Sequence, residues 1–199
     1  MEVSPPPTLH LEPLGRLWQQ AWLLDVPTGG PLRFAEWLAA LPADLDGAPS
    51  ASWRLDLLVA ERVADPGAAP VTVAPEPGGR CLPAEAIALL EAVLAELTTD
   101  EVPLEEAVTL LEPAVTELAD SEHWPVPSGQ RANLTSLAAQ LADRLTAAGV
   151  QVADVSRLLA VPAESANPET VRGFDLGRAA AACLDVPRAV LESAPRSER

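Results

Sequence analysis

Twenty-one prolines are spread along the 199-residue chain, and they limit every regular element to a short segment. A proline inside a helix removes one backbone hydrogen bond and clashes with the preceding turn. Between the prolines the chain is rich in alanine (36 residues) and leucine (31 residues). Both residue types favour helix over strand. The sequence therefore predicts an all-α protein, a bundle of six to eight helices.

Apolar residues at helical spacing predict where these helices lie. The longer ones cover 13–25, 31–41, 52–64, 83–97, 103–118 and 128–148, and shorter ones lie at 154–159, from 167 onward and near 178–184. We expect Ser128 to be the N-cap of the helix at 128–148 and Gly149 to end that helix. One alternative stays open. Apolar and polar residues alternate over 53–57, so this segment could instead pair with 71–73 as a small β-hairpin near 53–75.

Charge divides the chain into unequal parts. Residues 81–130 hold eleven acidic residues and no basic one, whereas 1–80 carry a net charge of −5 and 131–199 are neutral. The middle segment is therefore the source of most of the net charge of −16. A segment of this kind repels anions and attracts basic partners.

The same charge pattern and the loops suggest three parts. We expect a tryptophan-rich helical subdomain at 1–80 that ends in a Pro/Gly/Ala loop, a central acidic helical hairpin at 81–127, and a helical subdomain at 128–195. The loop between the two hairpin helices is short, so these helices should pack antiparallel.

No residue pattern points to catalysis, a cofactor or a metal. The chain has neither lysine nor a glycine-rich phosphate loop, and its two cysteines, Cys81 and Cys183, form no C-x-x-C pair. A small cluster at the end of the hairpin contains Glu117, Asp120, Glu122 and His123, but no matching carboxylates accompany it, so a carboxylate metal enzyme is the least favoured alternative. No apolar run approaches the length of a membrane span, and the N-terminal residues lack a basic, then apolar leader. We therefore expect a cytoplasmic protein that is not an enzyme.

These observations favour an adaptor or assembly protein that binds a basic protein partner. The candidate partner-binding residues are glutamates of the hairpin and two tryptophans one helical turn apart: Glu91, Glu96, Glu105, Glu106, Glu112, Glu117, Trp18 and Trp22. Two to four of the glutamates should lie exposed on one face, whereas the tryptophans either fill the core or form a binding anchor. Homo-oligomerisation through the leucine seam of the hairpin is a further alternative.

A short C-terminal stretch resembles a bacterial helix-turn-helix. The segment 155–162, followed by Pro168-Glu169-Thr170-Val171-Arg172, is similar to the first helix, turn and recognition-helix start of that motif, although 163–167 make the turn five residues too long. The resemblance implies a DNA-binding regulator with a degenerate motif at 150–191. Its candidate DNA contacts are Arg157, Arg172 and Arg178. The neutral charge of this region argues against a duplex-binding surface, which should be basic.

Overall fold

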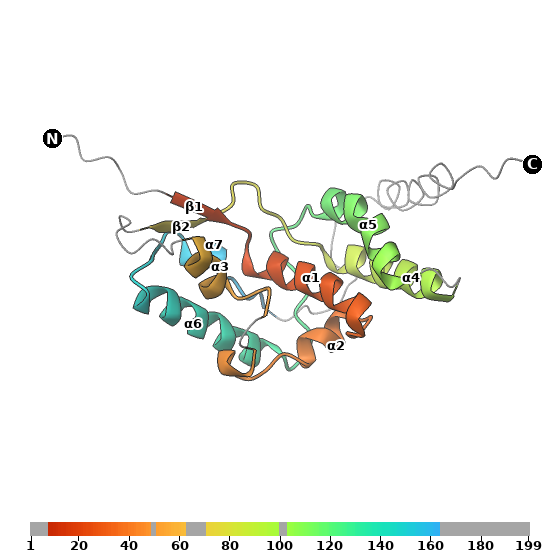
Figure 1. Cartoon of the computed structure of the whole chain (residues 1–199), viewed down its shortest axis with the longest axis horizontal. Coiled ribbons are helices and arrows are strands. Elements are labelled where there is room, and N and C mark those ends of the chain that lie inside the picture. The colour runs from red at the N-terminus through yellow and green to blue at the C-terminus, as the bar shows by residue number, and fades with distance from the viewer. Residues whose placement is uncertain (1–7, 49–50, 63–70, 100–102, 164–199) are drawn as a thin grey trace, which may run out of the picture.

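The computed structural model describes residues 8–48, 51–62, 71–99 and 103–163. Within these ranges the fold is mostly helical and contains one small sheet (Figure 1). The elements are, in order, β1 (Thr8–Leu11), α1 (Leu14–Asp25), the 3-10 turn η1 (Val26–Thr28), α2 (Phe34–Ala39), η2 (Leu45–Gly47), α3 (Leu55–Arg62), β2 (Thr72–Pro75), α4 (Ala84–Thr99), α5 (Leu104–Leu118), α6 (Arg131–Ala147), β3 (Gln151–Val152) and α7 (Val155–Leu158). The helices predicted after residue 163 lie outside the described residues.

The sheet has the order β1-β2-β3, and both pairs are parallel. Thr72 of β2 lies opposite Thr8 on one side and Gln151 on the other. Parallel neighbours need long connections, and here α1–α3 and α4–α6 supply them. The all-α prediction is thus only partly right, because the helices dominate but this sheet joins the start, middle and end of the described chain.

The alternative of a β-hairpin near 53–75 is wrong, and the preferred helix is confirmed as α3. Arg54 does not face solvent, as a strand with one polar side would require. It is 4% exposed, and its side chain bonds Asp56 and the carbonyls of Leu45 and Ala48. Residues 72–75 do form a strand, but it pairs with β1 and β3 instead.

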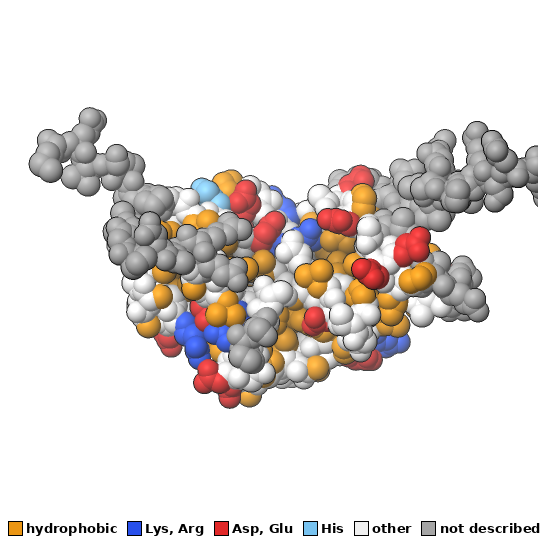
Figure 2. Space-filling model, viewed as in Figure 1, with side chains coloured by type: hydrophobic (Ala, Val, Ile, Leu, Met, Phe, Trp, Pro, Cys, Tyr) orange, Lys and Arg blue, Asp and Glu red, His pale blue; other side chains and the backbone are white. Residues whose placement is uncertain are grey.

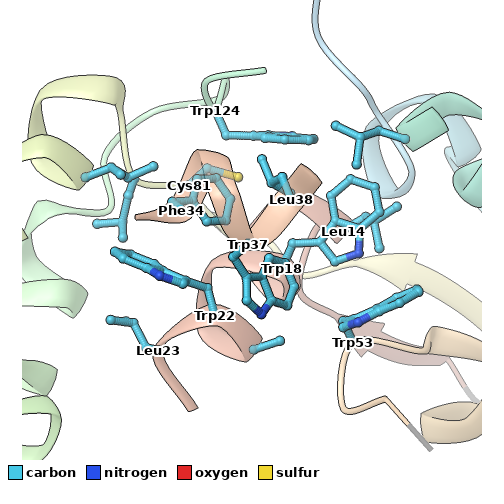
Figure 3. Packing of buried hydrophobic residues seen from close by; sticks show 14 of the residues in the cluster. Leu14, Trp18, Trp22, Leu23, Phe34, Trp37, Leu38, Trp53, Cys81 and Trp124 are labelled. Carbon is cyan, nitrogen blue, oxygen red and sulfur yellow. The ribbon is translucent and has the colours of Figure 1, made fainter. Parts of the chain in front are cut away.

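Aromatic side chains form the centre of the core (Figure 3). Trp18 meets the indole of Trp53 edge-on at 6.1 Å and that of Trp124 at 5.3 Å between ring centroids. Trp22 packs on Phe34 at 5.4 Å. Buried side chains from 1–80, 81–127 and the described part of 128–195 belong to one cluster. The large aromatic rings supply apolar area that the many alanines cannot.

The acidic segment forms the expected helical hairpin of α4 and α5. Its two ends are joined by an antiparallel bridge, in which the Cys81 N–H donates to the Ser121 carbonyl at 2.7 Å and the Ser121 N–H donates back at 3.1 Å. The bridge brings the start of α4 to the end of α5, which confirms the antiparallel prediction.

α6 buries four leucines at helical spacing but begins later than expected. Leu134, Leu137, Leu141 and Leu145 are all buried. Ser128 is not its N-cap; the residue before the helix is Gln130, whose side chain makes no capping bond. Gly129, at φ +79°, separates Ser128 from the helix, because a turn with this left-handed backbone comes first.

Candidate functional site

The hairpin glutamates divide into exposed and half-buried ones. Glu96, Glu105, Glu106, Glu112 and Glu117 are exposed, and acidic side chains lie over α4 and α5 in Figure 2. Glu91 is different: it is half-buried, and its Oε1 accepts a hydrogen bond of 2.8 Å from the Phe34 N–H. Burial raises the pKa of Glu91, and that hydrogen bond opposes the rise. Glu91 therefore ties α4 to the start of α2, and in this it differs from the exposed glutamates with which the sequence grouped it.

Four of the exposed glutamates share the outer side of α5. Glu105 and Glu112 are separated by about two helical turns, and Glu106 and Glu117 by about three, so each pair falls on one row of the helix. The opposite side is buried and contains Ala107, Leu111, Ala114 and Leu118. We call these two rows, Glu105 with Glu112 and Glu106 with Glu117, the acidic face. All four are exposed, but the two rows lie about 110° apart around the helix axis, so a single binding face stays a prediction.

Basic side chains are scarce near this face. Residues 81–130 contain no arginine or lysine. Within the described ranges, Arg80 forms an ion pair with Glu122 of this segment. Arg80 Nη1 lies 3.4 Å from Glu122 Oε1. Both side chains of that pair are exposed, so the interaction contributes little to stability. The hairpin segment therefore supplies no arginine or lysine of its own to the acidic face.

The two candidate tryptophans lie in the core. Trp18 and Trp22 are both 0% exposed, and Figure 3 shows them inside the aromatic cluster. The Trp22 indole N–H donates to the Pro31 carbonyl at 3.1 Å, which fixes the chain between η1 and α2. A surface anchor needs exposure, so the structure removes both residues from the candidate partner site.

A pocket of about 380 Å³ lies between α1 and α5, next to the acidic face. Side chains at helical spacing from both helices line it: Arg16, Gln20, Leu23 and Leu24 of α1, and Val108, Thr109, Glu112, Val115 and Thr116 of α5. Leu24 stands out because 62% of it is exposed. We call this cavity the α1–α5 pocket.

Sequence reasoning missed this pocket and its buried cation, Arg16. The residue lies between Leu14 and Trp18 in an apolar helix, and the nearby acid Glu12 precedes that helix and forms no recognisable motif with it. Its position on the side of α1 that faces α5 depends on how the two helices pack, which the residue spacing of α1 alone does not specify.

The structure gives little information on the candidate DNA-binding and metal sites. Arg157 is exposed on α7, a four-residue helix, and its backbone N–H donates a hydrogen bond to the N-cap residue Asp154. The other two candidate DNA contacts, Arg172 and Arg178, lie outside the described residues. In the described part of the chain, no three His, Cys, Asp or Glu side chains gather as a metal site would need. None of the described helices is long and apolar enough to cross a membrane.

Comparison with known proteins found no match among family models, curated proteins or solved structures.

Proposed function

We propose that the chain is a non-enzymatic adaptor or assembly protein whose acidic face binds a basic protein partner in the cytoplasm. The observation that carries the proposal is the two rows of exposed glutamates on α5, in a segment without any basic residue. Like charges this close repel one another, and a partner that brings arginines or lysines relieves that repulsion.

The surface beside the acidic face supports the same proposal. Leu24 and the apolar members of the α1–α5 pocket lie next to Glu112, so charged and apolar contacts are available together. Protein interfaces combine apolar contacts with charged groups that steer the encounter and fix the orientation. A basic segment with one apolar side chain fits this surface.

A pull-down with two charge-matched variants tests the proposal. Glu105→Gln/Glu106→Gln/Glu117→Gln removes three charges from the acidic face and leaves the lining of the α1–α5 pocket intact. Glu36→Gln/Glu76→Gln/Asp143→Asn removes three exposed charges elsewhere. Extract proteins retained by the wild type at about 50 mM salt are compared with those retained at about 300 mM, where exposed charges are largely screened.

The proposal expects a basic protein that survives nuclease, weakens at the higher salt, and is lost only with the first variant. Equal retention by both variants would remove the acidic face from the interaction. Recovery of DNA that nuclease abolishes, and that Arg157→Glu weakens, would favour the DNA-binding alternative. The melting temperature of each variant shows that a loss of binding is not a loss of fold.

A further inference from the structure

A second cavity adjoins the α1–α5 pocket at the start of α5. Its described lining consists of Pro103, Glu105, Glu106 and Thr109, and its volume is about 430 Å³. We call it the acidic pocket. Thr109 also lines the α1–α5 pocket, so the two cavities meet at this side chain. The α5 residues of the two linings are offset by one to two helical turns, which is about 5–10 Å along the helix.

The two cavities differ in charge. The described lining of the acidic pocket contains two carboxylates and no cation. In the α1–α5 pocket the charges of Arg16 and Glu112 cancel, and leucine and valine side chains supply much of the wall. Leu24, which is 62% exposed, adds apolar surface at the edge of that pocket. A cation is therefore favoured in the acidic pocket, and an apolar group in the α1–α5 pocket.

The side chains of α5 offer hydrogen-bond acceptors to an occupant. The Thr109 hydroxyl donates to the Glu105 carbonyl at 2.9 Å, and the Thr116 hydroxyl donates to the Glu112 carbonyl at 3.1 Å. Both hydroxyl hydrogens are thus used within the helix, and only lone pairs remain for a ligand. Among the described residues, no hydrogen bond or ion pair involves the carboxylates of Glu105, Glu106 and Glu112. An occupant must supply donors, and a guanidinium supplies several of them together with a positive charge.

From these observations we propose that the partner presents an arginine-containing helix, with an arginine in the acidic pocket and a large apolar side chain, such as leucine, in the α1–α5 pocket. Helix positions that are three, four or seven residues apart share one face and match the separation of the two pockets. A groove between two helices is a surface that an amphipathic helix can fill. The inference rests on the proposed function and adds which groups the partner brings and where each one binds.

The test is an NMR titration of the full chain with synthetic alanine-based helical peptides. The first peptide carries one leucine, followed by arginines three, four and seven residues later. The second has alanine in place of the leucine, the third has glutamine in place of the arginines, and the fourth has the leucine on the opposite face. We expect the first peptide to shift the backbone amides of Leu24, Thr109 and Thr116 saturably, with a dissociation constant of about 0.1–1 mM. Each of the other peptides should bind at least about fivefold more weakly.

A tryptophan substitution shows whether the leucine occupies the α1–α5 pocket. Thr116→Trp places an indole in that pocket and leaves the acidic pocket intact. Its control is Thr146→Trp, because Thr146 is an exposed threonine of α6 whose hydroxyl also donates to the carbonyl four residues before it. Thr116→Trp should weaken binding of the first peptide by about fivefold or more and leave binding of the alanine peptide unchanged. Thr146→Trp should affect neither peptide.

A charge substitution shows whether the arginine occupies the acidic pocket. Glu105→Gln/Glu106→Gln should weaken binding of the first peptide by about fivefold or more and leave binding of the glutamine peptide unchanged. Glu36→Gln/Asp143→Asn, which removes two exposed charges elsewhere, should leave binding of both peptides unchanged. The melting temperature of each variant shows that it is folded.

Several outcomes would overturn the proposal: no saturable binding of the first peptide up to about 5 mM, equal binding of the first and fourth peptides, or binding of the first peptide that neither Thr116→Trp nor Glu105→Gln/Glu106→Gln weakens. The pull-down separates this failure from a failure of the proposed function. A basic partner that Thr116→Trp retains in full, but that the variant with three glutamines in the acidic face loses, would overturn only the present inference. Absence of any basic partner would overturn the proposed function itself.

Discussion

The side chain of Gln19 forms two hydrogen bonds with the backbone of Leu82: Nε2 donates to the carbonyl at 2.9 Å and Oε1 accepts from the N–H at 2.8 Å. Gln19 lies in the middle of α1, and Leu82 lies two residues before α4, the first helix of the acidic hairpin. Both residues are 0% exposed. This pair of bonds therefore fixes the base of the hairpin against α1, and so positions α5 beside the helix with which it forms the pocket.

Replacing Gln19 with leucine should destabilise the protein by about 2–4 kcal/mol, because the N–H and the carbonyl of Leu82 would both stay buried and unpaired. Gln20→Leu is the matched control, since Gln20 is only half-buried and should change stability by about 0.5 kcal/mol or less. Urea unfolding of both variants measures the difference. Equal stabilities would mean that water or a shifted backbone replaces the two bonds.

The helices of the hairpin and α1 could be predicted from sequence because their signals are local. The stripe that includes Leu14, Trp18 and Trp22 predicted a helix at 13–25, and α1 covers Leu14–Asp25. The first hairpin helix, expected at 83–97, covers Ala84–Thr99. In both cases the side chains that define the period are those that the core buries.

The sheet could not be predicted in the same way. β1 has four residues and β3 two, and each pairs with a strand that is distant in the sequence. Strands this short carry little periodicity of their own, and parallel pairing leaves no turn signal between the partners. The partnered roles of Gln19 and Glu91 were missed for a related reason: a polar residue in a helix gives no sign of whether its partner is water or a distant backbone group.

The acidic face was the most predictable part of the candidate site, and the α1–α5 pocket the least. Exposure of Glu105, Glu106 and Glu112 follows from a helix whose opposite side is apolar. The pocket instead depends on which sides of α1 and α5 face each other. That arrangement follows from contacts such as Gln19–Leu82, which link positions far apart in the sequence.

Gly15 should tolerate no side chain, because a methyl group built on it would overlap the indole of Trp124. Trp124 is 3% exposed and packs edge-on against Trp18, so it has no free space to move into. Gly15→Ala should therefore destabilise by about 1–3 kcal/mol, the usual cost of overpacking, although alanine is the better helix former. Thermal unfolding measures the effect.

A double-mutant cycle with Trp124→Ala identifies the cause of that loss. If the ring is the obstacle, Gly15→Ala should cost much less in the Trp124→Ala background than in the wild type. An unchanged cost would place the strain in the α1 backbone instead.

The thiol of Cys81 should be unreactive in the folded protein. Burial raises its pKa to about 12, although Arg16 opposes the rise, and the residue is 2% exposed. Alkylation requires the thiolate. We expect no labelling of Cys81 by iodoacetamide at about pH 8 in a Cys183→Ser background, and complete labelling after urea is added. Rapid labelling of the native protein would show that the base of the hairpin opens readily.

Glu12 should make the protein less stable as pH rises from acid to neutral. Burial, more than any other influence, raises the pKa of Glu12, with a smaller contribution from Glu76 and an opposing one from Arg16. The folded protein then holds this proton to higher pH than the unfolded chain does. Stability is therefore lost as pH increases from the usual glutamate pKa of about 4.3 through the raised folded pKa.

Glu12→Gln removes this charge while it keeps the size of the side chain. The variant should match the wild type in urea unfolding at about pH 4 and be the more stable protein at about pH 7, because only the wild type loses stability in between. Asp143→Asn, which neutralises an exposed carboxylate on α6, should show no comparable divergence between these two pH values. If Glu12→Gln were instead the less stable protein at neutral pH, the attraction between Glu12 and Arg16 would outweigh the cost of burying the carboxylate.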